Sequence, residues 1–214
     1  MDGNDRHFRQ ERFASHVMVL MLRDTVPESL LEQFEAHASA DLRRHAMWFV
    51  GNEVSRPTSE IPDAARARGL SYWERRLAAA ISSNQRGDYQ EELGMISHWC
   101  FHGVVDELWL ADQLLAMFRI GLAPRNGHGT VEWLQKLAAR DIDRAVEVLW
   151  SLIRCSAVER WTYISNQAPI RFVLSEGLAK GTTETALRVG EVISYLATVG
   201  GSEFMDLDQS APST

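Results

Sequence analysis

Apolar residues recur at intervals of three or four positions along most of the chain, a spacing that gathers them on one side of an α-helix. The stretch 41–54 shows this pattern, because Leu42, Ala46, Phe49 and Val50 form an apolar stripe and leave arginine and asparagine residues for the solvent side. No stretch shows the sustained alternation of apolar and polar residues that a half-exposed strand requires. The sequence therefore predicts an all-α protein.

Turn-forming and capping residues divide this pattern into separate helices. Helices are expected over 12–22, 25–37, 41–54, 62–69, 71–82, 88–102, 106–120, 131–139, 142–154, 169–179 and 183–199. Gly69 is expected to end one short helix and Ser71 to begin the next. The stretch 106–120 is the most apolar, so we expect it to be the central helix. Residues 12–202 are predicted to form a single helical domain between flexible ends, 1–11 and 203–214.

The last two helical pairs match each other when the chain is shifted by about 41 residues. The shift places Leu137 on Leu178, Ala138 on Ala179, Ala145 on Ala186, Val146 on Leu187, Val148 on Val189 and Leu152 on Ile193. It also places Asp141 on Thr182, and both residue types are suited to begin a helix. Two helices repeated at this period are typical of HEAT and armadillo proteins.

Over residues 130–199 the chain resembles a HEAT-like α-solenoid, and it does so more loosely over 25–120. The resemblance concerns architecture only. It implies antiparallel helical hairpins that stack in a short, irregular solenoid and present an extended surface to a partner. The segment 55–69 interrupts any regular repeat. An irregular helical bundle is therefore the alternative architecture.

Composition and charge narrow the possible functions. The 214 residues carry a formal charge of -7, which argues against nucleic acid, because proteins that bind phosphate backbones rely on clustered basic residues. The longest apolar run near the start, Val17 to Leu22, is far shorter than the roughly 20 residues that cross a bilayer. Two cysteines cannot form a disulfide framework. We therefore expect a cytoplasmic protein with no membrane contact, and the preference for arginine over lysine indicates a GC-rich, bacterial genome.

The most metal-like residues are His98 and His102. They lie four positions apart, so on a helix the two imidazoles would share one face, as a metal site requires. Asp106 and Glu107 are the nearest further ligands. An ordinary helix end is the alternative interpretation, and no cofactor is expected.

Aromatic and arginine side chains gather between the last two helical pairs. Arg160, Trp161, Tyr163 and Arg171 lie in or beside this short connection. Such side chains are enriched where proteins bind one another, so these four are the candidate partner-binding residues. The remaining six tryptophans lie within expected helices, where packing in the core and between hairpins explains them: Trp48, Trp73, Trp99, Trp109, Trp133 and Trp150.

No catalytic motif is present, since the chain contains neither a Walker spacing nor a Gly-x-Ser-x-Gly elbow. The leading hypothesis is therefore a noncatalytic scaffold that binds a protein partner or a neighbouring domain of a larger assembly. A nucleic-acid enzyme is an alternative, because HEAT-like alkylpurine DNA glycosylases have a similar length and an all-helical build. A helical metal-binding enzyme centred on His98 and His102 is a third possibility.

Overall fold

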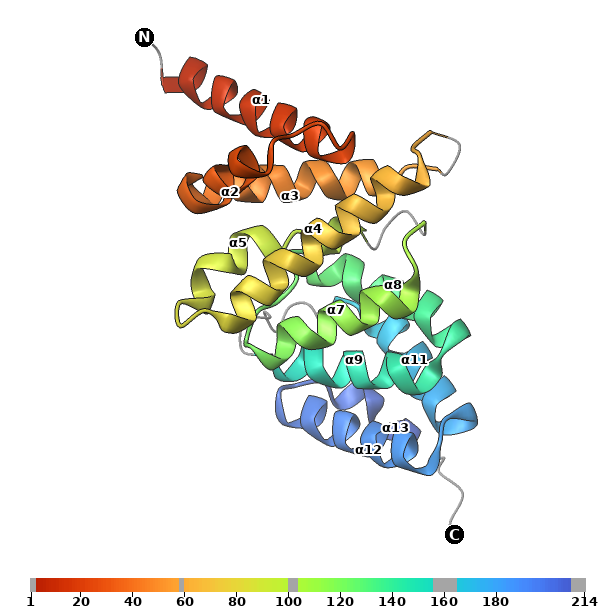
Figure 1. Cartoon of the computed structure of the whole chain (residues 1–214). Helices are drawn as coiled ribbons and strands as arrows, with labels where there is room; N and C mark the ends of the chain where they lie inside the picture. The colour runs from red at the N-terminus through yellow and green to blue at the C-terminus, as the bar shows by residue number, and fades with distance from the viewer. Residues whose placement is uncertain (1–2, 58–59, 100–103, 156–164, 209–214) are drawn as a thin grey trace. The chain divides into compact units, whose positions relative to one another are not determined.

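The computed structural model describes residues 3–57, 60–99, 104–155 and 165–208 (Figure 1). Every regular element within these residues is helical, which confirms the all-α prediction. Contacts between residues divide the chain into two compact units, Met1–Val105 and Asp106–Thr214. None of the described helices is both long and apolar enough to cross a membrane.

The first unit is built around one helix. Its elements are α1 (Gly3–Leu22), α2 (Glu28–His37), α3 (Ala40–Val54), α4 (Asp63–Ser82), the 3₁₀ turn η1 (Arg86–Tyr89), α5 (Gln90–Leu93) and α6 (Ile96–Trp99). Helix α3 contacts α1, α4, α5 and α6. Helix α1 begins at Gly3, earlier than the expected start near Arg12. The flexibility predicted for residues 1–11 is a separate property and stays a prediction. The core beneath α3 includes Trp73 and Trp99, whose rings meet edge to face with their centroids 5.3 Å apart.

The predicted break at Gly69 is wrong, because α4 continues through it as one helix. A β-carbon at Gly69 would overlap the side chain of Val54 and lie 3.2 Å from that of Val50, both on α3. The missing side chain therefore lets α4 approach α3 closely, which is a packing role within the helix. Ser71 accordingly lies inside α4 and begins no helix.

A buried ion pair joins α4 to α5. Glu92 is 1% exposed, and its two carboxylate oxygens accept hydrogen bonds from Nε and Nη2 of Arg76 at 2.6 and 3.0 Å. Arg43 from α3 lies 3.4 Å from the same carboxylate, and Glu35 from α2 lies 3.6 Å from Arg76. Four elements thus meet at one charged cluster that is shielded from solvent.

The second unit contains the two predicted hairpins. Its elements are α7 (Glu107–Arg119), α8 (Gly127–Arg140), α9 (Ile142–Arg154), α11 (Gln167–Lys180), α12 (Thr183–Thr198), η2 (Ser202–Phe204) and α13 (Met205–Asp208). Helices α8 and α9 pack together, as do α11 and α12, so both expected hairpins are confirmed. The helix-start residues are confirmed as well: Asp141 accepts a hydrogen bond from the backbone N–H of Arg144, and Thr182 accepts one from that of Thr185.

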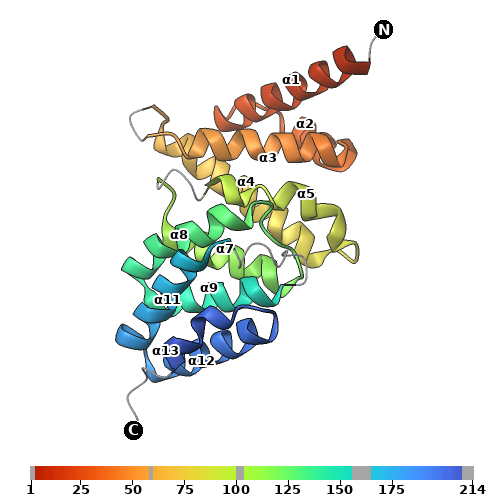
Figure 2. The same cartoon turned by 180° about the vertical axis from the view of Figure 1, so that it is seen from behind.

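Helix α9 is the central element of this unit, and not α7 as its composition suggested. It contacts α7, α8, α11 and α12, and Figures 1 and 2 both show it with α7 on one side and α12 on the other. Gly177 on α11 makes this packing possible, since a β-carbon there would lie 2.9 Å from methyl groups of Val146 and Val189. The second hairpin therefore stacks directly on the first. The single domain predicted over 12–202 and the flexible end predicted over 203–214 stay predictions. Phe204, which lies within 203–214, is fully buried.

The buried ion pair generates a stability prediction. Replacing Glu92 with alanine should lower the free energy of unfolding by about 3–5 kcal/mol, because Arg76 would keep a buried charge and lose the carboxylate that accepts its two hydrogen bonds. Urea denaturation followed by circular dichroism measures this change. Glu91→Ala is the matched control, since Glu91 is an exposed neighbour on the same helix and should change stability by less than about 0.5 kcal/mol. Similar losses in both variants would contradict a special role for the pair.

Candidate functional site

The proposed metal ligands lie partly outside the described residues. His98 is half-buried on α6, whereas His102 belongs to a segment that is not described. Asp106, a suggested further ligand, instead caps α7: its Oδ1 accepts hydrogen bonds from the backbone of Leu108 and Trp109 at 2.9 and 3.0 Å. Within the described parts of the chain, no three His, Cys, Asp or Glu side chains are placed to hold a metal ion. The metal site stays a prediction.

The predicted partner-binding residues are also only partly described. Arg160, Trp161 and Tyr163 lie in the segment 156–164, outside the described residues. Arg171 is described, and its guanidinium forms an ion pair with Asp206 at 2.8 Å. It also donates a hydrogen bond to the backbone oxygen of Glu203 and lies 5.7 Å from the ring centroid of Phe204. The described contacts of Arg171 therefore hold the C-terminal turns against α11.

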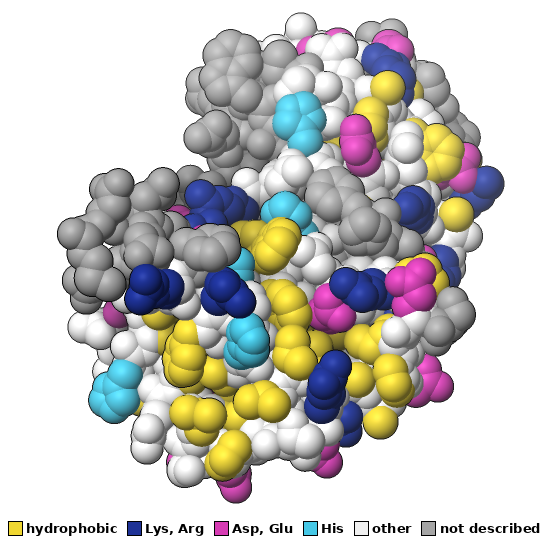
Figure 3. All heavy atoms as spheres, turned by 90° about the horizontal axis from the view of Figure 1, so that it is seen from above, with side chains coloured by type: hydrophobic (Ala, Val, Ile, Leu, Met, Phe, Trp, Pro, Cys, Tyr) yellow, Lys and Arg dark blue, Asp and Glu magenta, His cyan; other side chains and the backbone are white. Residues whose placement is uncertain are grey.

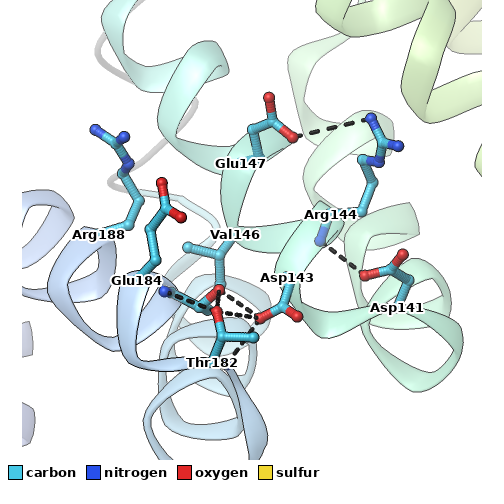
Figure 4. Close-up of a pocket in the computed structure, with 9 residues that line it drawn as sticks. Asp141, Asp143, Arg144, Val146, Glu147, Thr182, Glu184 and Arg188 are labelled. Atoms are coloured by element: carbon cyan, nitrogen blue, oxygen red, sulfur yellow. Dashed lines mark hydrogen bonds and ion pairs between the residues drawn. The ribbon is translucent and has the colours of Figure 1, made fainter.

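A charged groove lies where α9 and α12 begin, in the second unit (Figure 4). Its volume is about 460 Å³. The residues that line it are Asp141, Asp143, Arg144, Val146, Glu147, Thr182, Glu184, Thr185 and Arg188. Four carboxylates face two arginines, so this groove is suited to cationic or hydrogen-bond-donating groups.

Asp143 joins the two helices at the floor of the groove. Its Oδ1 accepts hydrogen bonds from the backbone N–H of Thr182 at 2.9 Å and from the hydroxyl groups of Thr182 and Thr185. The hydrogen bond from Thr185, followed by that from the Thr182 backbone, lowers the pKa of Asp143 below its ordinary value. A residue of α9 thus satisfies backbone donors at the start of α12 and fixes the register between the two hairpins.

Two polar stripes continue along the outer sides of these helices. Each stripe follows the spacing i, i+4, i+7, i+11, and every member on α12 lies 41 residues after its counterpart on α9. The stripes are Asp143, Glu147, Trp150 and Arg154 on α9, and Glu184, Arg188, Glu191 and Tyr195 on α12. Asp143 contacts Thr182 where both helices begin, and Trp150 contacts Tyr195 further along, so α9 and α12 run in the same direction. The internal repeat therefore builds a ladder of paired surface positions.

Trp150 is the centre of this ladder. The Cζ atoms of Arg154 and Arg188 lie over its ring, 5.0 and 5.4 Å from the centroid, which is within the range of cation–π attraction. Tyr195 meets Trp150 edge to face, with ring centroids 6.2 Å apart. Arg188 also forms an ion pair with Glu191 at 2.6 Å. We call Trp150, Arg154, Arg188 and Tyr195 together the Trp150 cluster.

Sequence reasoning missed this cluster, because Trp150 was assigned to packing in the core or between hairpins and not to a binding surface. Trp73, Trp99 and Trp133 are buried, whereas Trp109 is half-buried and Trp48 is exposed. Trp150 is half-buried and meets Tyr195 between the two hairpins. The available signal was helical register. Trp150 follows Asp143 and Glu147 at the spacing of one helix face, and a tryptophan on a charged face is exposed unless a neighbour covers it.

Exposed apolar side chains alone do not distinguish a binding surface in this protein. Figure 3 shows one face on which hydrophobic side chains gather among arginine and histidine side chains. Large exposed hydrophobic residues are spread over several helices: Phe13, Leu20, Trp48, Ile81, Phe172, Leu187 and Met205. Single exposed residues of this kind are common on soluble proteins. The Trp150 cluster differs because arginine and aromatic groups are organised around one ring.

Comparisons of the chain with known protein families, with curated proteins and with solved structures found no match. Its function must therefore be inferred from its own residues.

The bridge at Asp143 generates a pH prediction. Asp143→Asn should lower the free energy of unfolding by up to about 1 kcal/mol at neutral pH, because a neutral amide oxygen accepts these hydrogen bonds more weakly than a carboxylate does and the site is exposed. Because folding lowers the pKa of Asp143, its contribution is complete above about pH 5 and is lost as the pH falls through the folded-state value. The difference between wild type and variant should therefore shrink on acidification, as measured by thermal unfolding between pH 7 and pH 3. Glu147→Gln is the control, and a constant difference for Asp143→Asn would contradict the role.

Proposed function

We propose that this protein is a noncatalytic, HEAT-like helical scaffold that binds a segment of a protein partner along α9 and α12. The observation that carries the proposal is the Trp150 cluster, in which two guanidinium groups and a tyrosine surround a half-exposed tryptophan. Tryptophan, tyrosine and arginine are the residues that contribute most often to hot spots of protein binding. The stacked hairpins support the proposal, since repeated helix pairs create an extended surface of this kind.

The charges along the two helices define the partner's chemistry. Arg154 lies in the last turn of α9, and it has no carboxylate partner among the described residues. Four carboxylates line the groove at the opposite end of the surface. A complementary segment would place an apolar or aromatic side chain on Trp150 and an acidic side chain beside Arg154. It would place a basic side chain in the groove near Glu184.

The two alternative functions receive no comparable support from the described residues. A DNA glycosylase needs a cationic lining to hold the phosphate backbone, whereas the groove carries more acidic than basic side chains. The metal-binding alternative depends on His98 and His102 together, and only His98 is described. Among these candidate functions, binding of a polypeptide therefore has the most support from the described residues.

Peptide selection tests the proposal directly. A phage-displayed library of random peptides would be selected on the full chain, and the affinity of synthetic copies measured by fluorescence anisotropy. Selected peptides should combine an apolar or aromatic residue with both acidic and basic residues. Trp150→Ala should weaken their binding at least about thirtyfold, the loss expected on removing a hot-spot side chain. Arg154→Glu should weaken binding about tenfold or more, and raised salt should reduce this difference.

Matched variants separate binding from folding. Arg119→Glu makes the same charge change in the last turn of α7, and Trp48→Ala removes a partly exposed tryptophan from α3. Both should bind the selected peptides within about threefold of wild type, and thermal unfolding should show that all variants are folded. Selection of no saturable binder, or equal losses in Trp150→Ala and Trp48→Ala, would refute the proposed surface.

A further inference from the structure

A second cavity lies within the first unit, where the end of α1 meets the start of α4. Its volume is about 580 Å³, within the range of roughly 300–1,000 Å³ that is typical of small-molecule sites. Apolar side chains form much of its wall. They are Val19, Leu22, Ile61, Pro62 and Ala65, of which Leu22, Ile61 and Ala65 are buried. Such a wall can cover the apolar part of a ligand.

Charged side chains at this cavity favour an anion. Its lining includes three arginines and two glutamates, a formal charge of plus one in a chain whose total is -7. Arg56 and Glu53 neutralise each other in an ion pair of 2.8 Å. Arg68 donates hydrogen bonds to the backbone oxygen of Leu22, so it keeps its full positive charge while it ties α4 to α1. The cavity therefore joins an apolar wall to an uncompensated cation.

Arg23 provides a second cation at the cavity. It follows the last residue of α1 and is exposed, and among the described residues its guanidinium has no carboxylate partner. The backbone around it is fixed, because the N–H of Arg23 bonds to the oxygen of Val19 and Asp24 adopts a left-handed φ of 59°. The turn therefore holds the base of the Arg23 side chain at the cavity edge and leaves its guanidinium available to a ligand.

We propose that this cavity binds a small amphipathic monoanion, namely a carboxylate attached to an aliphatic chain. The chain would lie against Leu22, Ile61 and Ala65, and the carboxylate would pair with Arg23, with Arg68 adding positive potential behind it. A multiply charged ligand such as a nucleotide fits less well, because Glu60 lies at the same cavity and two of the three arginines are engaged, Arg56 with Glu53 and Arg68 with the backbone of Leu22. This site is separate from the Trp150 cluster and does not depend on the proposed peptide binding.

A series of straight-chain carboxylates tests the proposal. Isothermal titration calorimetry of the full chain with hexanoate, octanoate and decanoate should show saturable binding to one site. The affinity should rise about fourfold for each added methylene group, as expected when each group leaves water for an apolar wall. Decanol should bind more weakly than decanoate, because it lacks the charge that pairs with Arg23. Binding without chain-length dependence, or equal binding of decanol, would overturn the proposal.

Three variants locate the site. Arg23→Gln should weaken decanoate binding at least fivefold and leave decanol binding unchanged. Arg86→Gln, an equal charge change at an exposed arginine of η1 that does not line the cavity, should leave both unchanged. Ala65→Leu should weaken the binding of both ligands, because the larger side chain fills the cavity. If thermal unfolding shows that Ala65→Leu is destabilised, Val19→Phe serves as the cavity-filling variant in its place. Equal decanoate affinities in Arg23→Gln and Arg86→Gln would refute the assignment.

Discussion

Burial of one apolar stripe against another helix is the interaction on which both units depend. Isolated helices shorter than about 12–15 residues are marginal in water, and most helices of this chain are of that size or only slightly longer. Each must therefore be covered by its neighbours, and the closest approaches occur where a glycine replaces a side chain. Gly69 brings α4 onto α3, and Gly177 brings α11 against α9 and α12. These contacts set the positions of the helices, and the other features of the structure depend on those positions.

The position of the Trp150 cluster follows from this packing. Helix α9 buries Ala145, Val148 and Leu152 against its neighbours, so the opposite side of the helix must face outward. The capping of α12 by Asp143 then fixes the register of the second hairpin on the first, which brings Arg188 and Tyr195 to Trp150. The proposed binding surface thus arises as a consequence of hairpin stacking.

Charged groups serve two different purposes in this protein. The pair between Arg76 and Glu92 is buried, so its value lies in the large penalty for separating the two charges. Arg23 and Arg154 are exposed and have no carboxylate partner among the described residues, so ion pairing of these side chains adds little to folding, and they are the charges that we propose for ligand binding. Whether a charged side chain is buried and paired therefore distinguishes structural charges from candidate binding charges more clearly than its residue type does.

The sequence by itself determined the all-α class, the two C-terminal hairpins and the start residues of α9 and α12, because helical periodicity and capping depend on residues close together in the chain. It did not determine that Gly69 lies inside a helix, since a glycine that ends a helix and one that admits a neighbouring helix look alike until the neighbour is placed. It likewise assigned Trp150 to packing in the core or between hairpins, although the helix register placed it on a charged face. Only the tertiary structure brought Arg188 and Tyr195 to that ring, because both lie on α12, about 40 residues further along the chain than Trp150.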